Sequence, residues 1–312
     1  MIEAKKFEIA VILINFNSSS YTINCVNSII ESTSVSTDFQ IIVIDNCSEK
    51  EDYNKLGTYC QSSDFKALKL VRNNINVGFG AGNMLGVHYA NANYYAFINN
   101  DSILLNDCIT ILNNAMKNNS NYGVCGPMAF KENKTLLPVL DHFTSPIKEI
   151  VGRSFLETIN PKKYPNRRIE YTQPQQAEFI SGSFIMIKAE DFHEVGGFDT
   201  NLFLYYEETD LCKRLSKINK FTFLIPDAKY IHFHGASTAK SIAIKTELKI
   251  SLLYIIRKHY GFFWYLIILN KMRIQYFFKS FFKPSYWKLF AVLLAGAPLS
   301  KSLKVKQKIK SL

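Results

Sequence analysis

The chain has 312 residues, 47% of them hydrophobic, with 37 Lys and Arg against 26 Asp and Glu. This length predicts one large α/β domain with an appendage, or two domains, and the hydrophobic content supports a substantial core. The six cysteines include no CxxC pair, which argues against a zinc site and against a small disulfide scaffold. Residues 1–8 are charged and lack an apolar signal-peptide core, so we expect the protein to stay in the cytoplasm.

Four short apolar runs in the first hundred residues predict strands. They lie at 7–16, 39–44, 67–71 and 94–98. Helical patterns occupy 21–30 and 79–92, between these runs. Short apolar strands that alternate with helices predict a mostly parallel sheet covered by helices.

Polar clusters stand at the ends of these strands or in the loops that follow them. They lie at 15–17, 45–46, 73–82 and 99–101. The chain order places all four at one edge of one sheet, where open α/β sheets bind their ligands. Asp45 stands where a carboxylate typically holds a ribose hydroxyl or a base edge, and Asp101 is a candidate for metal or phosphate chemistry. The alternative is that Asn99, Asn100 and Asp101 form a turn and a helix cap.

The loop between the third strand and the second helix is rich in glycine. Its sequence from Asn76 to Asn83 would let the backbone approach a ligand and then open a helix whose N-terminus favours anions. It lacks the GxGxxG spacing and a Walker lysine, so a dinucleotide site and a P-loop are both disfavoured.

The second half of the chain is less regular. A helix is predicted near 107–118, and the pattern then loosens from 127 to 175, which we interpret as an irregular segment that sets acceptor specificity. Regular patterns then return and predict a strand region, two helices and a further strand. They lie at 177–187, 189–195, 207–217 and 220–225.

Three acids open the helix predicted at 207–217. Glu207, Glu208 and Asp210 follow two tyrosines that can exclude water, so a general base with a raised pKa is plausible here. The alternative is that acids in a first turn simply complement the helix dipole. His232 and His234 follow the last predicted strand, and either could join Asp101 on a divalent cation.

The net positive charge of the chain comes from its last quarter. No Asp or Glu follows Glu247, whereas thirteen Lys and Arg do, interleaved with apolar runs at 262–269 and 289–299. Neither run reaches the ~18–20 residues of a spanning helix, so the pattern predicts a cationic amphipathic segment lying on the inner face of the membrane. The alternatives are an ordinary helical subdomain with a basic end and, less favoured, a nucleic-acid site.

Seven motifs together resemble one family of enzymes. They are VILINFN, IIVIDNCS, NNINVGFGAGN, FINND, FISGSFIMIKAEDFHEVGGFD, FLYYEETDLCKRL and IHFHGAS. In this order, over about residues 7–260, they resemble the inverting family-two glycosyltransferases of the GT-A fold. They are most similar to the rhamnosyltransferase-like enzymes of bacterial surface-polysaccharide assembly. The resemblance implies a GT-A domain over 1–240, a Rossmann-like, mostly parallel sheet flanked by helices. A helical, basic extension that associates with the membrane would follow over 241–312.

The resemblance also implies roles for individual residues. The nucleotide would be bound by residues at the strand ends and in the glycine-rich loop. The donor sugar would lie above a short stretch that contains Ser181 and Gly182. Together these binding residues are Asn15, Asn17, Asp45, Asn76, Gly78, Asn83, Asn100, Asp101, Ser181 and Gly182. Asp101 is then the acid of a DxD-type motif whose first acid is Asn99 here, and His232 would help it hold Mn²⁺ or Mg²⁺. His234 is the alternate to His232.

Glu207 and Glu208 fall on the acidic pair of the family, one of which removes the acceptor proton, while Asp210 would support the pair. We favour Glu207 and keep Glu208 open. The implied reaction is a single displacement that moves a sugar, with rhamnose as one candidate, from a dTDP- or UDP-sugar to a saccharide or lipid-linked acceptor with inversion.

Two other functions would require different residues. A non-catalytic nucleotide-binding scaffold of a membrane polysaccharide complex would not need the acidic pair or Asp101. A sugar nucleotidyltransferase would need a Gly-rich, basic loop after the first strand, which is missing. The sequence leaves both sugars and the oligomeric state open.

Overall fold

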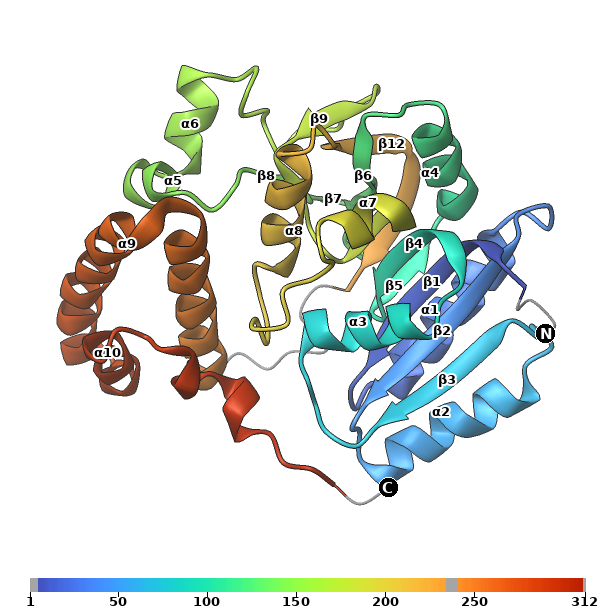
Figure 1. Cartoon of the computed structure of the whole chain (residues 1–312), viewed down its shortest axis with the longest axis horizontal. Coiled ribbons are helices and arrows are strands. Elements are labelled where there is room, and N and C mark those ends of the chain that lie inside the picture. Colours follow the sequence, from blue (N-terminus) through green and yellow to red (C-terminus); the bar gives the residue numbers. More distant parts are fainter. Residues whose placement is uncertain (1–4, 234–240, 311–312) are drawn as a thin grey trace.

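The computed structural model describes residues 5–233 and 241–310 and contains one mixed ten-stranded sheet with helices packed against it (Figure 1). The central path runs in the order β3-β2-β1-β4-β11-β6-β12-β5. The first four strands of the chain are mutually parallel. They are β1 (Phe7–Asn15), β2 (Phe39–Asn46), β3 (Leu68–Asn73) and β4 (Ala92–Asn99). This half has the predicted parallel arrangement.

Helices connect these strands and pack on them. They are α1 (Ser19–Ser32), α2 (Lys50–Ser62) and α3 (Phe79–His88). Helix α3 lies against β1 closely enough that a Cβ on Gly86 would come within 2.4 Å of Ile12. Nearer the start of α3, a Cβ on Gly82 would lie 3.1 Å from Ile14 close to the carboxyl end of β1.

The parallel register decides which side chains meet at the sheet edge. Asn15 is paired with Asp45, and Asp45 is paired in turn with Arg72 on β3. Asn99 at the end of β4 is paired with Ile14 on the other side of β1. The polar residues at the ends of β1, β2 and β3 therefore form a continuous row. The end of β4 lies next to this row, on the other side of β1.

The second half of the sheet is mixed. Its strands are β5 (Ser102–Leu104), β6 (Tyr122–Phe130), β7 (Leu136–Leu137), β9 (Gln175–Ala177), β11 (Phe184–Lys188) and β12 (Phe221–His232). Helices α4 (Cys108–Lys117), α7 (Ala189–Glu194) and α8 (Glu207–Ser216) connect and cover them. Strand β12 is twice as long as the run predicted from the sequence, because the chain continues past Pro226. A register shift between Ile225 and Lys229 accommodates this proline, which cannot donate to a regular ladder.

The segment predicted to be irregular contains some regular structure. Besides β7, it holds β8 (Leu140–Asp141), which pairs with β10 (Phe179–Ile180), and the short helices α5 (Pro146–Val151) and α6 (Arg153–Ile159). The helices are too short to show a clear period, and Gly152 (φ +87°) separates them. The prediction of a wholly irregular segment was therefore wrong for α5 and α6.

The C-terminal helices form a second apolar cluster beside the sheet domain. They are α9 (Ile242–Phe282) and α10 (Tyr286–Leu294), followed by short 3₁₀ turns at Leu299–Lys301 and Leu303–Lys306. Gly261 has a φ of +85° and breaks α9 into two helical parts, which Figure 1 shows as a sharp bend. Among the described residues, α9 is the one helix long and apolar enough to cross a membrane by length and composition. It is also broken in the middle and buries part of its surface against α10.

Candidate active site

A buried polar floor lies at the carboxyl ends of β1 and β2. The Asn15 side-chain amide donates to Asp45 Oδ1 (2.9 Å) and to Ser48 Oγ (3.0 Å), and its oxygen accepts from the Thr22 hydroxyl (2.7 Å). All four residues are buried. The orientation of Asp45 is thereby fixed by hydrogen bonds before any ligand arrives. Asn17, predicted with Asn15, is exposed at the edge of this floor, and its backbone N–H donates to Ser48 Oγ (2.9 Å).

Asp52 on α2 also belongs to this floor, although its place inside a polar helix carries no motif. Its carboxylate accepts from the Asn15 amide and from the Ser19 backbone N–H, each at 2.9 Å. Burial opposes ionisation of Asp52, but the hydrogen bonds from Asn15 and Ser19 outweigh it and lower the pKa of the carboxyl. The floor therefore holds two carboxylates, Asp45 and Asp52, on either side of one amide.

The glycine-rich loop is shaped by Asn46. Its amide donates to Asn76 Oδ1 (3.0 Å) and to the Gly78 carbonyl (3.1 Å), and its oxygen accepts from Val77 N–H (3.1 Å). Gly78 has a φ of +85°, and a Cβ there would lie 2.1 Å from the Phe203 carbonyl oxygen. Only glycine fits this position.

Asn83 takes a different place from the rest of the predicted donor residues. It is buried in α3, and its amide donates to the Phe79 carbonyl (3.1 Å) one turn earlier. The observed contact is thus internal to the helix.

The end of β4 carries the three polar residues 99–101. The Asn100 amide donates to Ser18 Oγ (2.7 Å) and Thr22 Oγ1 (2.8 Å), which ties this strand end to the start of α1. Asp101 Oδ1 lies 3.1 Å from His232 Nε2, and both side chains are buried. The backbone N–H of Phe233 also donates to the Asp101 carbonyl (3.0 Å). The end of β12 therefore places His232 in contact with Asp101, although the two residues are 131 positions apart in the sequence.

Asp101 and His232 form a small donor set suited to a divalent cation. One carboxylate and one imidazole lie side by side, whereas no group of three or more His, Cys, Asp or Glu side chains that could hold a metal ion occurs in residues 5–233 and 241–310. Mg²⁺ and its relatives commonly use one or two protein carboxylates and take their remaining ligands from water and phosphate. The residues present fit that pattern. His234, the alternate ligand, lies outside the described residues.

The start of α8 carries the acidic pair. Tyr205 and Tyr206 both have positive φ angles (76° and 73°), which turns the chain sharply so that α8 begins at Glu207. Glu207 is buried, and its Oε1 has no hydrogen-bond partner among the described residues. Burial, reinforced by the neighbouring charge of Glu208, raises the pKa of Glu207 from 4.5 to about 8.

Glu208 differs from Glu207 in its surroundings. Glu208 is partly exposed, and its Cβ would lie 3.6 Å from a Cβ added to Gly182. Cγ of Glu207, in contrast, would lie 3.2 Å from a Cβ added to Gly80. Burial also raises the pKa of Glu208. The two carboxylates therefore point to different elements: Glu207 toward α3, and Glu208 toward the turn before β11.

That turn contains the two residues predicted to lie beneath the donor sugar. Ser181 N–H donates to the Val139 carbonyl (2.8 Å), and its hydroxyl accepts from Ser183 Oγ (3.2 Å), which lies 2.7 Å from the Tyr230 hydroxyl. The adjacent Gly182 packs within reach of the Phe79 ring. Ser181 and Gly182 are thus held between the acidic pair and the glycine-rich loop.

Asp210 is the centre of an ion cluster. Its carboxylate accepts from Arg214 Nε (2.9 Å) and lies 2.7 Å from Lys258 Nζ and 2.8 Å from His259 Nε2. Burial opposes the charge, but His259, Arg214 and Lys258 together lower the pKa of Asp210 strongly. The cluster joins α8 to α9 and so anchors the helix that carries Glu207 and Glu208.

A cleft of about 450 Å³ opens over the polar strand ends. Asn46, Asn76, Gly78, Asn99 and Asn100 line it, together with residues from the C-terminal part of the chain. These are Ile244, Leu303 and Gln307. Its volume is that of a small-molecule site.

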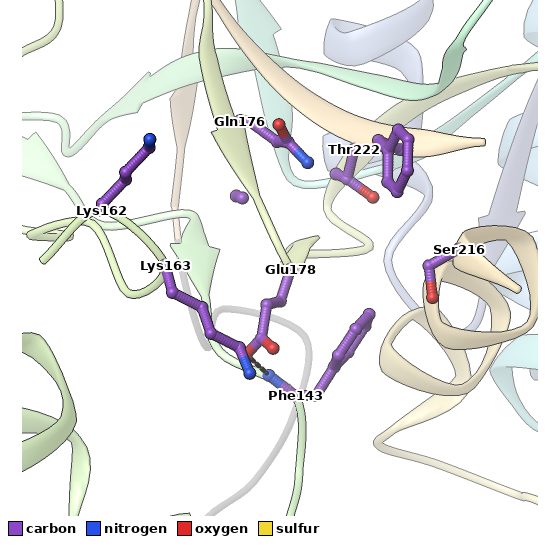
Figure 2. Close-up of a pocket in the computed structure, with 9 residues that line it drawn as sticks. Phe143, Lys162, Lys163, Gln176, Glu178, Ser216 and Thr222 are labelled. Carbon is purple, nitrogen blue, oxygen red and sulfur yellow. Dashed lines mark hydrogen bonds between the residues drawn. The ribbon is translucent and has the colours of Figure 1, made fainter. Parts of the chain in front are cut away.

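A second cavity of about 270 Å³ lies elsewhere, between β9, the loop after α6 and the far end of α8 (Figure 2). Glu178 points into it and accepts from Phe143 N–H (2.8 Å), and burial raises the pKa of Glu178. Ser216 lines this cavity eight residues after Glu208, which is about 12 Å along a helix. The cavity is thus separate from the acidic pair.

Comparison with known proteins identifies the family. Residues 10–196 match the model of glycosyl transferase family 2. The chain belongs to that family. This glycosyltransferase is 28% identical over 229 residues to rhamnosyltransferase WbbL of Escherichia coli strain K12, a match that covers 70% of this chain and 83% of WbbL. It is 25% identical over 211 residues to dTDP-rhamnosyl transferase RfbF of Shigella flexneri, over 67% of this chain and 64% of RfbF.

The fold of the glycosyltransferase also matches solved structures. The mannosyltransferase PcManGT from Pyrobaculum calidifontis, in complex with GDP-Man and Mn²⁺, superimposes with a TM-score of 0.58 at 12% identity, over 96% of this chain and 88% of that chain. These comparisons confirm the predicted GT-A fold and nucleotide-sugar-dependent glycosyl transfer. They also confirm the predicted similarity to rhamnosyltransferases. The scaffold alternative is not favoured.

Asn46, Asp52, Leu303 and Gln307 belong to the site, although none of them is among the binding residues predicted from the sequence. Asn46 follows Asp45 in the second polar cluster and could have been chosen by its position, whereas Asp52 lies inside a helix among other polar residues. Leu303 and Gln307 lie about 200 residues beyond the strand ends and carry no local signal at all. Only the folded chain brings them to the cleft.

Proposed function

We propose that this glycosyltransferase moves rhamnose or a related hexose from a dTDP- or UDP-sugar to a saccharide or lipid-linked acceptor, with inversion, in cell-surface polysaccharide synthesis. The rhamnosyltransferase names of its relatives support the donor class. The observation that carries the reaction is the pairing of Asp101 with His232 beside a cleft that is also lined by Leu204, three residues before the acidic pair begins at Glu207.

In this proposal the polar floor binds the nucleoside. Asp45, held by Asn15, faces the base and ribose, with Asn17 at its rim. The Asn76–Gly78 loop and Asn100 face the ribose and diphosphate, and Asn83 supports the loop from within α3. Ser181 and Gly182 lie beneath the sugar, between the cleft and Glu208.

Asp101 and His232 would hold a Mn²⁺ or Mg²⁺ ion. The Mn²⁺ in PcManGT supports this assignment by fold. When bound, the ion supplies positive charge that stabilises the leaving diphosphate. Asp101 also orients His232 through their 3.1 Å contact, so loss of either side chain disturbs the other.

The proton of the acceptor is taken by the acidic pair. Glu207, which the sequence favoured as the base, is almost fully buried, whereas Glu208 is partly exposed and lies beside Gly182. Accessibility to an incoming hydroxyl therefore favours Glu208 as the base instead. Burial and the negative charge of Glu208 raise the pKa of Glu207 to about 8, so Glu207 keeps its proton beside the base. The attack is a single displacement, in which the acceptor oxygen bonds to the anomeric carbon as the diphosphate leaves.

The membrane would be contacted by two parts of the chain. Exposed apolar side chains occur on α5 and α6 (Ile147, Phe155, Ile159) and near the end of α9 (Phe278, Phe281, Phe282). The ammonium of Lys271 on α9 donates to the Glu149 carbonyl of α5, which joins these parts, and Figure 1 shows α5 next to the bend of α9. With Lys279 and Lys283 nearby in sequence, this surface suits an anionic bilayer on the cytoplasmic side.

One experiment tests the assignment of donor and base together. Nucleotide sugars are supplied with and without Mn²⁺ to the wild type, Asp101→Ala and Glu208→Gln, and transfer to a diphospholipid-linked saccharide is measured. We expect both variants to lose 10²-fold or more of the rate, with Asp101→Ala also weakening donor binding. Glu194→Gln, an exposed change on α7, is the control. Wild-type rates from both site variants would contradict the proposal.

A further inference from the structure

The segment 302–310 runs from the C-terminal helices back to the edge of the sheet. In Figure 1 this red stretch of chain passes from the region of α10 toward α2. At its start, Ser302 Oγ and Leu303 N–H donate to the two oxygens of Glu247, each at 2.7 Å, and Glu247 is buried in α9. At its end, Lys310 N–H donates to the Asn74 carbonyl (2.8 Å) in the loop before α3. The segment is therefore tied at both ends.

Between these ties the segment borders the donor cleft. Leu303 and Gln307 line it opposite Asn46, Asn76 and Asn100. The cleft still holds about 450 Å³ with the segment in place, a volume within the range of small-molecule sites. The segment thus forms a wall of the cleft and does not fill it.

The segment is basic, whereas the cleft beside it is lined by uncharged residues. None of the described residues that line the cleft is charged. The segment carries four lysines, Lys304, Lys306, Lys308 and Lys310, of which Lys304 contacts the Thr200 carbonyl and Lys310 contacts Glu49. None of these lysines lines the cleft, so their charge would act on a bound nucleoside diphosphate only at longer range.

We propose that segment 302–310 is part of the donor site and that Gln307 contacts the bound nucleotide. Its side-chain amide can both donate and accept hydrogen bonds, as a base or ribose requires. The inference rests on the proposed function, because it assumes a nucleotide in this cleft. It gives the C-terminal extension a second role, in which the helices that contact the membrane also complete the donor site.

The test uses the full chain with UDP and dTDP as probes, in the presence of Mn²⁺, with affinity measured by calorimetry. We expect Gln307→Ala to weaken binding of the preferred nucleotide at least fivefold. Val305→Ala changes an exposed side chain of the same segment that does not line the cleft, so it should bind like the wild type. Equal affinity for Gln307→Ala and the wild type would overturn the proposal, and tighter binding would show that the segment obstructs the cleft.

Hydrogen exchange of the wild type provides a second measurement that does not depend on a variant that folds. The nucleotide should slow amide exchange in 303–310 as well as in the Asn76–Gly78 loop. Slowing in the loop alone would overturn the inference but leave the proposed function standing. A wild type that binds no nucleotide in calorimetry would instead refute the proposed function, and the inference with it.

Discussion

Replacing Glu207 by Gln should change how the stability of the protein depends on pH. The pKa of Glu207 is raised from 4.5 to about 8 by burial and by Glu208. The native state therefore keeps a proton that the unfolded chain releases above pH 4.5, so rising pH favours unfolding through the window from about 4.5 to 8. A difference of about 3.5 in pKa corresponds to about 5 kcal/mol, of which about 4 kcal/mol is lost by pH 8.

Glutamine mimics the protonated carboxyl and cannot lose that proton. Glu207→Gln should therefore match the wild type at pH 5 and exceed it at pH 8 by up to about 4 kcal/mol, or roughly 10 °C in Tm. Thermal unfolding at half-unit steps from pH 5 to 8.5 measures the difference, and the exposed Glu194→Gln is the control. If the wild type and Glu207→Gln keep a constant gap across this range, the carboxyl is ionised in the native protein and the reasoning fails.

Two further predictions concern the loop and the membrane surface. Gly78→Ala should destabilise the fold by more than about 1 kcal/mol, since its φ is +85° and a Cβ would meet the Phe203 carbonyl; Gly57→Ala, in an open helical position, should be neutral or stabilising in the same urea titration. The double change Phe281→Ser and Phe282→Ser should reduce binding to anionic vesicles in flotation at low salt, whereas Val35→Ser, an exposed apolar change on the opposite part of the chain, should not. Retained binding by the double variant would place the contact elsewhere.

The sequence was a good guide to the first half of the fold. The β-branched run of β1 and the acid at the end of β2 have local signatures, and parallel pairing then aligned Asn15 with Asp45. The sequence was a poorer guide where an element is interrupted by proline or is too short to show a periodic pattern. Strand β12 continues beyond Pro226 through a register shift, and α5 and α6 are each too short to show a period.

The sequence by itself determined the parallel sheet, the polar residues at the strand ends and the place of the acidic pair at the start of a helix. These depend on side-chain spacing along short stretches of chain, which is readable without a structure. Only the tertiary structure decided the contact of Asp101 with His232, the different burial of Glu207 and Glu208, and the approach of Gln307 to the cleft. The physical reason is that burial and long-range contact arise from the packing of elements far apart in the chain, which no local spacing encodes.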